Sequence, residues 1–475
     1  MMKVNSIICI WLLSLMVVWS CSKGQEPGGQ AEGTVPVTES VSIQDGATGV
    51  AVDLGYIDVT YDVPVAVADA SAITLSGTEV EVTAMNMKIR ISFGDLLGET
   101  EYTLTVGKGA VVSRTGNLPA EALTLTFTTG EDPDASYVPG EPGDYSPTLA
   151  VENPLPAADR LYRYLLDIYG RKTLSGAMAH VDWNTDEAEW VGRYTGKYPA
   201  IAFFDYIHLT DSGDGEWIDY GDITTVREWW EDGGLVGASW HWNVPVSQGS
   251  SEISFSADGN SFSASEAVRE GTWENDVVNA DLDKLAGYLK LLQAEGIPVL
   301  WRPLHEAAGN TYTYNSGAWF WWGADGAAAF RNLWIYVFEY LEKAGVNNLI
   351  WVWTTQTSVY EDADYAFYPG DEYVDIVGRD IYNLNDASAI AAQFGTIARM
   401  TTHKMVTFSE LGGVPDMAAQ WDAGANWLYF MPWYDYDNDY TEGYDHEHAD
   451  MDWWKASFAS DAVITRDELP ADLFE

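Results

Sequence analysis

The chain has 475 residues, 47% of them hydrophobic, which is enough apolar surface for more than one folded domain. Its formal net charge of −48 at pH 7 argues against nucleic acid or another polyanion as a partner, because phosphate binding requires a basic surface. The acidic residues are scattered, as on a well-solvated surface, and the aromatic content is high, with 22 Trp and 27 Tyr.

The first residues have the pattern of an export signal that ends in a lipid-attachment site. One basic residue, Lys3, precedes an apolar run that is shorter than a membrane span requires. The run ends in VWSC, which resembles a bacterial lipobox. We therefore expect residues 1–20 to be a lipoprotein signal peptide and Cys21 to carry a lipid. An ordinary signal peptide followed by a chance cysteine is the alternative.

Lipidation at Cys21 predicts where the protein resides. Cys9 would leave with the signal peptide, so the mature chain would have no disulfide. The lipid would anchor the protein to the bacterial outer membrane, on the cell surface or on the periplasmic face. Residues 21–36 are rich in Gly, Gln and Glu and are expected to form a flexible tether.

Residues 37–130 have the pattern of a small all-β sandwich. Short apolar segments alternate with Gly, Asp, Asn and Pro, as in GYIDVTYDV, AITLSG, MKIRISF, EYTLTVG and LTLTFTT. The region resembles bacterial immunoglobulin-like domains. It contains no convergent polar cluster, so we expect it to be a spacer, with sugar binding as the alternative. Residues 131–148 are rich in Pro and Gly and are interpreted as a linker.

Residues 149–475 alternate between strand-like and helix-like segments. Two segments have helical periodicity, one through Leu282, Leu285, Leu289 and Leu292 and one through Phe330, Leu333, Trp334, Val337 and Leu341. The strand candidates are KTLSGAMAH, YPAIAFFDYIH, LVGASWHWNVP, IPVLWRPLHE, NLIWVWTT, VDIVGRDIYN, KMVTFSELGG and NWLYFMPWYDY. Near-continuous apolar strands separated by helices indicate a parallel sheet covered by helices. Eight such units predict an α/β fold, the (β/α)8 TIM barrel.

Two glutamates lie where such a barrel carries its active site. Glu306 ends the fourth strand and Glu410 the seventh, and the C-terminal ends of the strands form the floor of the site. Paired carboxyl groups suit glycoside hydrolysis, in which one protonates the leaving oxygen and the other attacks the anomeric carbon. A separation of about 5–5.5 Å would allow direct attack with retention of configuration.

Several motifs in this region resemble glycoside hydrolase family 26, whose best-known members are β-mannanases. They are WRPLHEAAG, AWFWWG, YPGDEYVDIVGRDIY and FSELG, and the resemblance covers about residues 150–470. It implies that Glu306 is the acid/base and Glu410 the nucleophile of a retaining enzyme. The expected substrates are mannan, galactomannan and glucomannan, cleaved at β-1,4-mannosidic linkages. No cofactor or metal is expected, and a monomer is expected.

The resemblance also assigns residues around the two glutamates. His305 would contact the sugar or orient Glu306, with a core histidine as the alternative. Arg302 can hold a carboxylate through paired hydrogen bonds and so keep Glu410 anionic, or form a structural salt bridge. Tyr382 would donate a hydrogen bond to the nucleophile, with Asp380 behind it.

Further aromatic residues are expected to bind the polysaccharide. Trp240 and His241, at the end of the third strand, match a family position that contacts substrate. Trp319 and Trp433 match aromatic positions around the cleaved sugar. Core packing is the alternative for each tryptophan.

The sequence departs from the commonest family pattern in two loops. GNTYTYNSGA lengthens the loop after Ala307-Ala308, and DYDNDYTEGYDHEHADMD follows the eighth strand. These departures leave the two glutamates in place but are expected to alter the subsite walls, so mixed-linkage β-glucan and β-1,3-xylan are alternative substrates to mannan. A non-catalytic glycan-binding lipoprotein is another alternative. A metal-dependent hydrolase using Asp445-His446-Glu447-His448 is disfavoured, because these alternating positions lack a helix and a distant third ligand.

Overall fold

The computed structural model describes residues 33–475 except 51, 53, 95, 99, 131–141, 181–182, 214, 312–316, 358–360 and 438. The predicted signal peptide, Cys21, most of the tether and most of the linker lie outside the described residues. Within the described part of the chain, every helix is too short or too polar to cross a bilayer.

The N-terminal domain is built from two four-stranded sheets whose longer strands alternate in burial. Tyr56–Tyr61 and Glu101–Val106 each bury every second side chain, so one face of each strand forms the core. The first sheet has the order β1 (Thr38–Val41), β3 (Tyr56–Tyr61), β7 (Lys88–Ser92), β6 (Glu81–Met85). The second has the order β2 (Ala47–Val50), β10 (Leu123–Thr129), β8 (Glu101–Val106), β5 (Ile73–Leu75), with β2 parallel to β10. Strands β4 (Val65–Val67) and β9 (Val111–Ser113) form a separate pair, and η1 spans Ala70–Ala72.

The larger domain contains a closed parallel barrel. Within the described residues, eight strands follow one another around it, and β11 closes the ring by pairing with β12. The strands are β11 (Thr173–Met178), β12 (Ile201–Asp205), β13 (Leu235–Trp240), β16 (Val299–Pro303), β17 (Leu349–Gln356), β18 (Ile376–Tyr382), β19 (Met405–Gly412) and β20 (Tyr429–Pro432). Seven of the eight predicted strand segments contain one of them in full, and β17 extends one residue beyond its segment, to Gln356. A short strand, β21 (Val463–Ile464), adds to the edge of β11.

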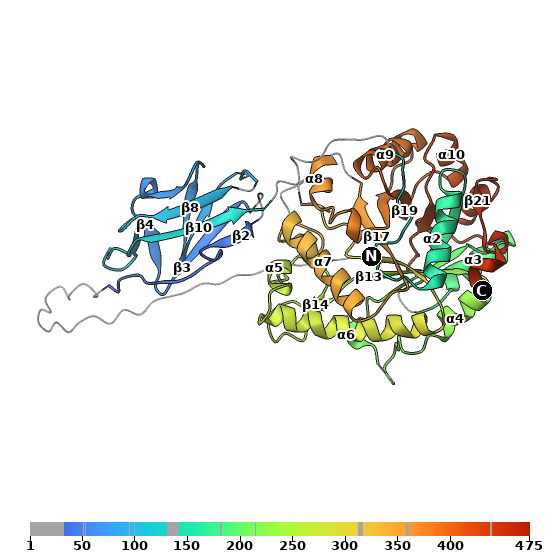
Figure 1. Cartoon of the computed structure of the whole chain (residues 1–475), viewed down its shortest axis with the longest axis horizontal. Coiled ribbons are helices and arrows are strands. Elements are labelled where there is room, and N and C mark those ends of the chain that lie inside the picture. Colours follow the sequence, from blue (N-terminus) through green and yellow to red (C-terminus); the bar gives the residue numbers. More distant parts are fainter. Residues whose placement is uncertain are drawn as a thin grey trace, which may run out of the picture. The chain divides into compact units, whose positions relative to one another are not determined.

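Helices cover the outside of the barrel (Figure 1). They are α2 (Pro156–Ile168), α3 (Asp186–Thr195), α4 (Thr224–Glu231), α6 (Trp273–Ala294), α7 (Ala327–Lys343), α9 (Ala387–Met400), α10 (Met417–Asp422) and α11 (Met451–Phe458). The apolar residues of the two predicted helical patterns are buried. They are Leu282, Leu285, Leu289 and Leu292 on α6, and Phe330, Leu333, Trp334, Val337 and Leu341 on α7. The predicted barrel and the all-β N-terminal domain are therefore confirmed.

Several short elements lie in the segments that connect the strands and helices or follow the last strand. They are the hairpin β14 (Val244–Pro245) and β15 (Ile253–Ser254), helices α5 (Ala264–Ala267) and α8 (Glu361–Ala366), and the 3-10 turns η2 (Leu209–Asp211), η3 (Trp321–Gly323), η4 (Asp371–Tyr373), η5 (Arg466–Glu468) and η6 (Ala471–Phe474). The aromatic run after β16 forms η3, and its indoles tie loops together. Trp321 Nε1 donates to the carbonyl of Trp242 at 2.8 Å, and Trp322 Nε1 donates to that of His305 at 2.9 Å.

Candidate active site

The chain turns sharply where β16 ends. Leu304 and Glu306 both adopt left-handed backbone conformations, with φ of 50° and 52°. Non-glycine residues rarely take these values, and they persist where the surrounding structure enforces them. The amide of Glu306 donates a hydrogen bond to the carbonyl of Thr354 on β17 at 3.0 Å. The turn thus fixes Glu306 at the C-terminal end of the barrel.

Arg302 lies in the barrel interior among polar side chains from four other strands. Its guanidinium pairs with Asp380 and lies 2.9 Å from Oε2 of Glu410. Nε donates to Thr354 Oγ1 at 3.3 Å, and Nη1 donates to Ser239 Oγ at 3.4 Å. A fully buried cation requires such partners, because an unpaired buried charge is strongly destabilising. Arg302 therefore joins the two acidic side chains at one place.

A shift in strand pairing brings two consecutive residues of β19 to the same site. Ser409 donates to Asp380 Oδ1 at 2.6 Å, while the next residue, Glu410, pairs with Arg302. In a regular strand, neighbouring side chains point to opposite faces. The register of β18 against β19 shifts between Gly378 and Asp380, and that of β19 against β20 shifts as well. Such irregularities redirect side chains near active sites.

Glu410 is held through both of its carboxylate oxygens. The hydroxyl of Tyr382 donates to Oε1, and the Arg302 guanidinium lies beside Oε2. Burial, together with the negative charge of Glu410, raises the pKa of Tyr382 well above its usual value, so the phenol remains a donor. A donor on one oxygen and a cation at the other suit an ionised carboxylate. An oriented anion is what a nucleophile at this position needs.

Glu306 is placed to hold a proton. Its side chain is partly accessible, yet surrounding protein desolvates the carboxyl group. Burial, followed by the negative charges of Asp380 and Glu410, raises the pKa of Glu306 well above its usual value. Burial also raises the pKa of Asp380, to about 7 even with the opposing effects of Arg302 and Ser409. Because both oxygens of Asp380 already accept hydrogen bonds, from Arg302 and Ser409, the proton is better placed on Glu306.

Two histidines lie beside the glutamates. The ring of His305 is 4.4 Å from that of His241, and burial together with the charge of Arg302 lowers the pKa of His305 well below its usual value. A neutral His305 results, and its Nδ1 has no hydrogen-bond partner among the described residues. His241 Nδ1 lies 2.5 Å from Asp205 Oδ2, and its amide donates to the other oxygen at 3.1 Å. Asp205 thus fixes the orientation of the His241 ring.

The predicted tryptophans occupy different environments. Trp319 is 44% exposed and rests on Gly309, where a Cβ would come within 2.2 Å of the indole. Trp433 is partly buried, with its ring 5.6 Å from that of His241. Trp240 is fully buried and stacks on Trp242 at 3.9 Å. Trp319 and Trp433 are accessible to a ligand, whereas Trp240 packs the core, which is the alternative interpretation stated for it above.

Arg302 and Asp380 lie behind the two glutamates. Neither side chain has any exposed surface. A ligand at the barrel end therefore has no access to them, and any effect they have on it must pass through neighbours such as Glu410, which Arg302 contacts.

A pocket of about 70 Å³ opens at the ends of β11, β12, β13 and β20. Its lining includes Asp205, His241, Trp433, Tyr434 and Tyr436. The sequence interpretation missed Asp205, Tyr434 and Tyr436. Asp205 and Tyr434 lie at or just beyond the C-terminal ends of their strands, as Glu306 does. Applying the strand-end rule to every strand, rather than only to those with a recognised motif, would have identified both.

The acidic loop after β20 is held by a contact with α3 and by hydrogen bonds within the loop itself. His446 Nε2 lies 3.2 Å from Oε2 of Glu187 on α3, and His446 Nδ1 accepts hydrogen bonds from the amides of His448 and Ala449. Both ring nitrogens of His446 are thus engaged by protein groups. Among the residues that the structure describes, no group of three or more His, Cys, Asp and Glu side chains is arranged to hold a metal ion.

A parallel barrel with one glutamate of raised pKa after its fourth strand, and a second that contacts an arginine and a tyrosine on its seventh, has the architecture of a glycoside-cleaving enzyme. Comparison with protein families supports this class. The sequence profile of glycosyl hydrolase family 26 matches residues 151–468, and that of a bacterial Ig-like domain matches residues 32–129. The chain belongs to glycosyl hydrolase family 26, as the sequence motifs predicted.

Individual relatives agree with this assignment. Mannan endo-1,4-beta-mannosidase B of Piromyces sp is 35% identical over 336 residues, which cover 69% of this chain and 54% of the relative. The GH26 domain of an endo-beta-mannanase/endo-beta-glucanase from Prevotella bryantii is 39% identical with a TM-score of 0.62, covering 68% of this chain and 99% of that domain. A beta-mannanase from a symbiotic protist of the termite Reticulitermes speratus, solved with gluco-manno-oligosaccharide, is 33% identical with a TM-score of 0.59, covering 69% and 98%. The chain spans about half the length of the first of these relatives.

Proposed function

We propose that the protein is a retaining β-mannanase, which hydrolyses β-1,4-mannosidic linkages in mannan, galactomannan and glucomannan. The observation that carries this proposal is the contrast between the surroundings of the two glutamates. Glu306 has a raised pKa, and Glu410 lies between Arg302 and Tyr382. Similar proteins named mannan endo-1,4-beta-mannosidase support mannan as the substrate.

The two glutamates would act by double displacement. Glu306 donates its proton to the glycosidic oxygen while Glu410 attacks the anomeric carbon, which forms a covalent glycosyl-enzyme and releases the leaving sugar. Glu306, now ionised, then removes a proton from water, and the resulting hydroxide displaces Glu410. Tyr382 and Arg302 keep Glu410 oriented in both steps. Burial and the negative charges of Asp380 and Glu410 keep Glu306 protonated before the first step.

The substrate surface suits an uncharged polymer. Trp319 and Trp433 offer aromatic faces on which sugar rings can stack. His241 and Asp205 place polar atoms in the pocket for hydroxyl groups. A chain with a net charge of −48 repels polyanions but not neutral polysaccharides.

Replacing the nucleophile tests the proposal most directly. Glu410→Ala should abolish hydrolysis of mannan, because no group remains to attack the anomeric carbon, while the fold and the affinity for polysaccharide persist. Reducing-sugar release measures the first, and circular dichroism with affinity electrophoresis measures the others. Turnover that survives in Glu410→Ala would remove Glu410 from this role.

Mixed-linkage β-glucan is a second candidate substrate. The similar Prevotella bryantii protein is described as both an endo-beta-mannanase and an endo-beta-glucanase. Product analysis on plain mannan, galactomannan, mixed-linkage glucan and β-1,3-xylan would identify the backbone that is cleaved. The sizes of the products would also distinguish internal from terminal cleavage.

We also propose that the protein is attached to the bacterial outer membrane through a lipid on Cys21, with the immunoglobulin-like domain as a spacer. The VWSC sequence after a short apolar run supports this location. Cys21→Ser should shift the protein from the membrane fraction to the soluble fraction and abolish incorporation of labelled fatty acid. A Cys9→Ser variant is the matched control and should remain in the membrane fraction.

A further inference from the structure

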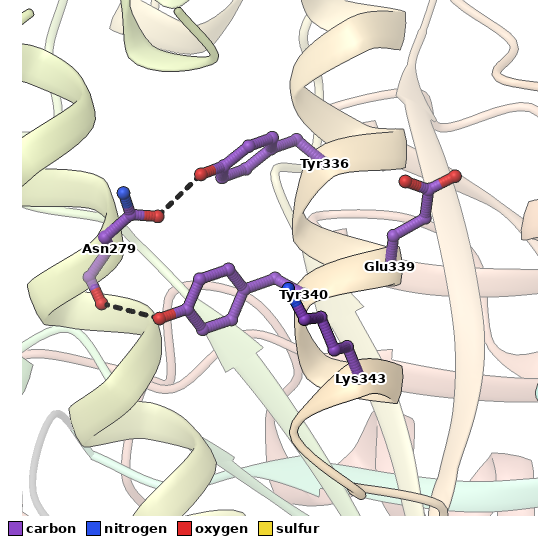
Figure 2. A pocket seen from close by; sticks show the side chains of 5 residues that line it. All are labelled: Asn279, Tyr336, Glu339, Tyr340 and Lys343. Carbon is purple, nitrogen blue, oxygen red and sulfur yellow. Dashed lines mark hydrogen bonds between the residues drawn. The ribbon is translucent and has the colours of Figure 1, made fainter. Parts of the chain in front are cut away.

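A second pocket lies on the outer surface of the barrel, between α6 and α7. Its volume is about 390 Å³, and its lining residues are Asn279, Tyr336, Glu339, Tyr340 and Lys343 (Figure 2). Four of the five come from α7, at positions that share one face of the helix. The pocket shares no lining residue with the one beside His241.

Two tyrosine rings form the centre of this groove. Tyr336 and Tyr340 lie one helical turn apart, with ring centroids separated by 6.2 Å and ring planes inclined by 37°. Both rings are partly exposed, and both extend from α7 toward α6 (Figure 2). Paired aromatic faces at the surface can stack against the apolar faces of successive sugar rings.

The hydroxyl groups of both rings are anchored on α6. Tyr336 donates to Asn279 Oδ1 at 2.6 Å, and Tyr340 donates to Asp283 Oδ1 at 2.8 Å. These hydrogen bonds fix the ring orientations before any ligand arrives. Binding to rings that are already ordered loses little side-chain entropy, which favours association.

The charges at the groove select against anionic ligands. Glu339 and Lys343 are exposed on α7, and Asp283, which accepts the Tyr340 hydrogen bond, is exposed on α6. Two acids and one base leave the rim slightly negative, while offering both acceptors and donors for hydroxyl groups. A neutral polyhydroxylated ligand fits this combination of groups.

We propose that this groove is a second polysaccharide-binding site, separate from the catalytic pocket. The identity of its ligand rests on the proposed function, because we assign to it the same uncharged β-linked polymer. Helix α7 begins at Ala327, after the β16 loop that carries Trp319, and Tyr336 lies about 14 Å further along the helix at 1.5 Å per residue. The groove is therefore remote from the catalytic pocket, and it would act by keeping the enzyme attached to the polymer while the catalytic pocket engages another part of it.

Adsorption to insoluble polysaccharide tests the site in the full chain. In a Glu410→Ala background, which prevents degradation, Tyr336→Ala/Tyr340→Ala should bind insoluble mannan at least fivefold more weakly than its parent. Tyr194→Ala, a tyrosine truncation on α3, is the matched control and should bind as the parent does. Equal adsorption by the double variant and the parent, or failure of the parent to adsorb, would overturn the proposal.

Kinetics separate this site from the catalytic one. With Glu410 intact, the double variant should hydrolyse short soluble manno-oligosaccharides at the parental rate but act several-fold more slowly on insoluble mannan. Parental rates on both substrates would contradict a role for the groove. Failure of the parent to cleave any mannan would instead count against the proposed function, and adsorption to mannan, mixed-linkage glucan and β-1,3-xylan would still report on the groove.

A footprint of Lys343 tests the groove without altering its tyrosines, whose hydrogen bonds join two helices. The Glu410→Ala chain is acylated with and without mannohexaose, and modified lysines are quantified by mass spectrometry. Lys343 should react at least threefold more slowly with the oligosaccharide present, while Lys197 and Lys455, exposed elsewhere on the barrel, should react at unchanged rates. An unchanged rate at Lys343 would overturn the proposal.

Discussion

The surroundings of Glu306 fit the acid role that we propose for it. Its left-handed backbone places the carboxyl group beside Asp380 and Glu410, whose negative charges add to the effect of burial and raise its pKa. Arg302 lowers the pKa of Glu306, but its single positive charge faces both of these acids, so burial and the two negative charges prevail. Under the proposed mechanism, two identical side chains therefore take different roles because one is paired with a cation and the other is not placed to share it.

This division of roles predicts a dependence on the leaving group. Glu306→Ala should slow hydrolysis of mannan by about 10²–10⁴-fold, the usual contribution of general acid catalysis. Aryl β-mannosides with acidic phenols need little protonation, so their glycosylation step should be largely spared. Pre-steady-state release of the phenol measures that step. Equal losses on both substrate types would contradict the assignment of Glu306 as the acid.

At the level of residues, the sequence predicted the positions of the two glutamates but not how deeply the neighbouring side chains are buried. The position of Glu306 after β16 and of Glu410 on β19 follows from recognisable strands and motifs. The burial of Trp240 and the exposure of Trp319 depend on which way each side chain points. In strands this direction reverses with every residue and shifts again at irregular pairings, so a linear pattern does not determine it.

At the level of elements, long buried strands were predictable and short exposed ones were not. Strands of the barrel such as β17 and β19 bury every residue, which gives a continuous apolar signal. Strands β1 and β2 of the sandwich have four residues each and no buried side chain, so they lack both length and alternation. Elements that bury more side chains therefore leave a clearer hydrophobic pattern in the sequence.

The interior of β18 offers a test of how closely the barrel packs beneath the site. A Cβ at Gly378 would lie 2.2 Å from Ser409 Oγ and 2.6 Å from Thr354 Oγ1. Gly378→Ala should therefore lower the free energy of unfolding by about 1–3 kcal/mol and reduce kcat, because Ser409 is displaced from Asp380. Urea denaturation and steady-state kinetics measure the two effects.

Helix α6 provides the matched control for this substitution. Gly287 lies in the helix, and no atom comes within 4 Å of the position that an alanine methyl group would take, so alanine meets no obstacle there. Gly287→Ala should raise the free energy of unfolding by about 0.5–1 kcal/mol, as expected for a helix interior. If Gly378→Ala lowers the free energy of unfolding no more than Gly287→Ala does, the barrel interior can relax around the added methyl group.

At the level of the whole molecule, acidic groups are buried as well as exposed. Burial raises the pKa of Asp281 to about 6 and that of Asp375 also to about 6. Both accept hydrogen bonds that tie distant segments together. Trp242 Nε1 donates to Asp281 at 2.7 Å, and the amides of Ala150 and Trp351 donate to Asp375, each at 2.7 Å.

These buried acids predict that stability falls as the pH rises from about 4 to about 6. Their pKa in the unfolded chain is about 3.9, so over this range the native state binds more protons than the unfolded state. The free energy of unfolding therefore decreases with pH, and repulsion among the many surface acids acts in the same direction. Differential scanning calorimetry between pH 4 and 7 measures the change.

The Asp281→Asn variant isolates one of these groups. Asparagine can still accept the Trp242 hydrogen bond but does not titrate. The fall in stability between pH 4 and 6 should become shallower, by on the order of 2–3 kcal/mol for a shift of this size. A slope identical to that of the parent would show that Asp281 does not titrate in this range.

The loop after β20 has a further consequence for selection among sugars. His446 binds this loop to α3 through Glu187, and the loop carries Tyr434 and Tyr436 at the pocket edge. This contact joins the loop to α3 in the absence of carbohydrate. If the proposed substrate binds here, we expect a branch directed at Tyr434 and Tyr436 to be excluded sterically, so that selection would act against branched chains.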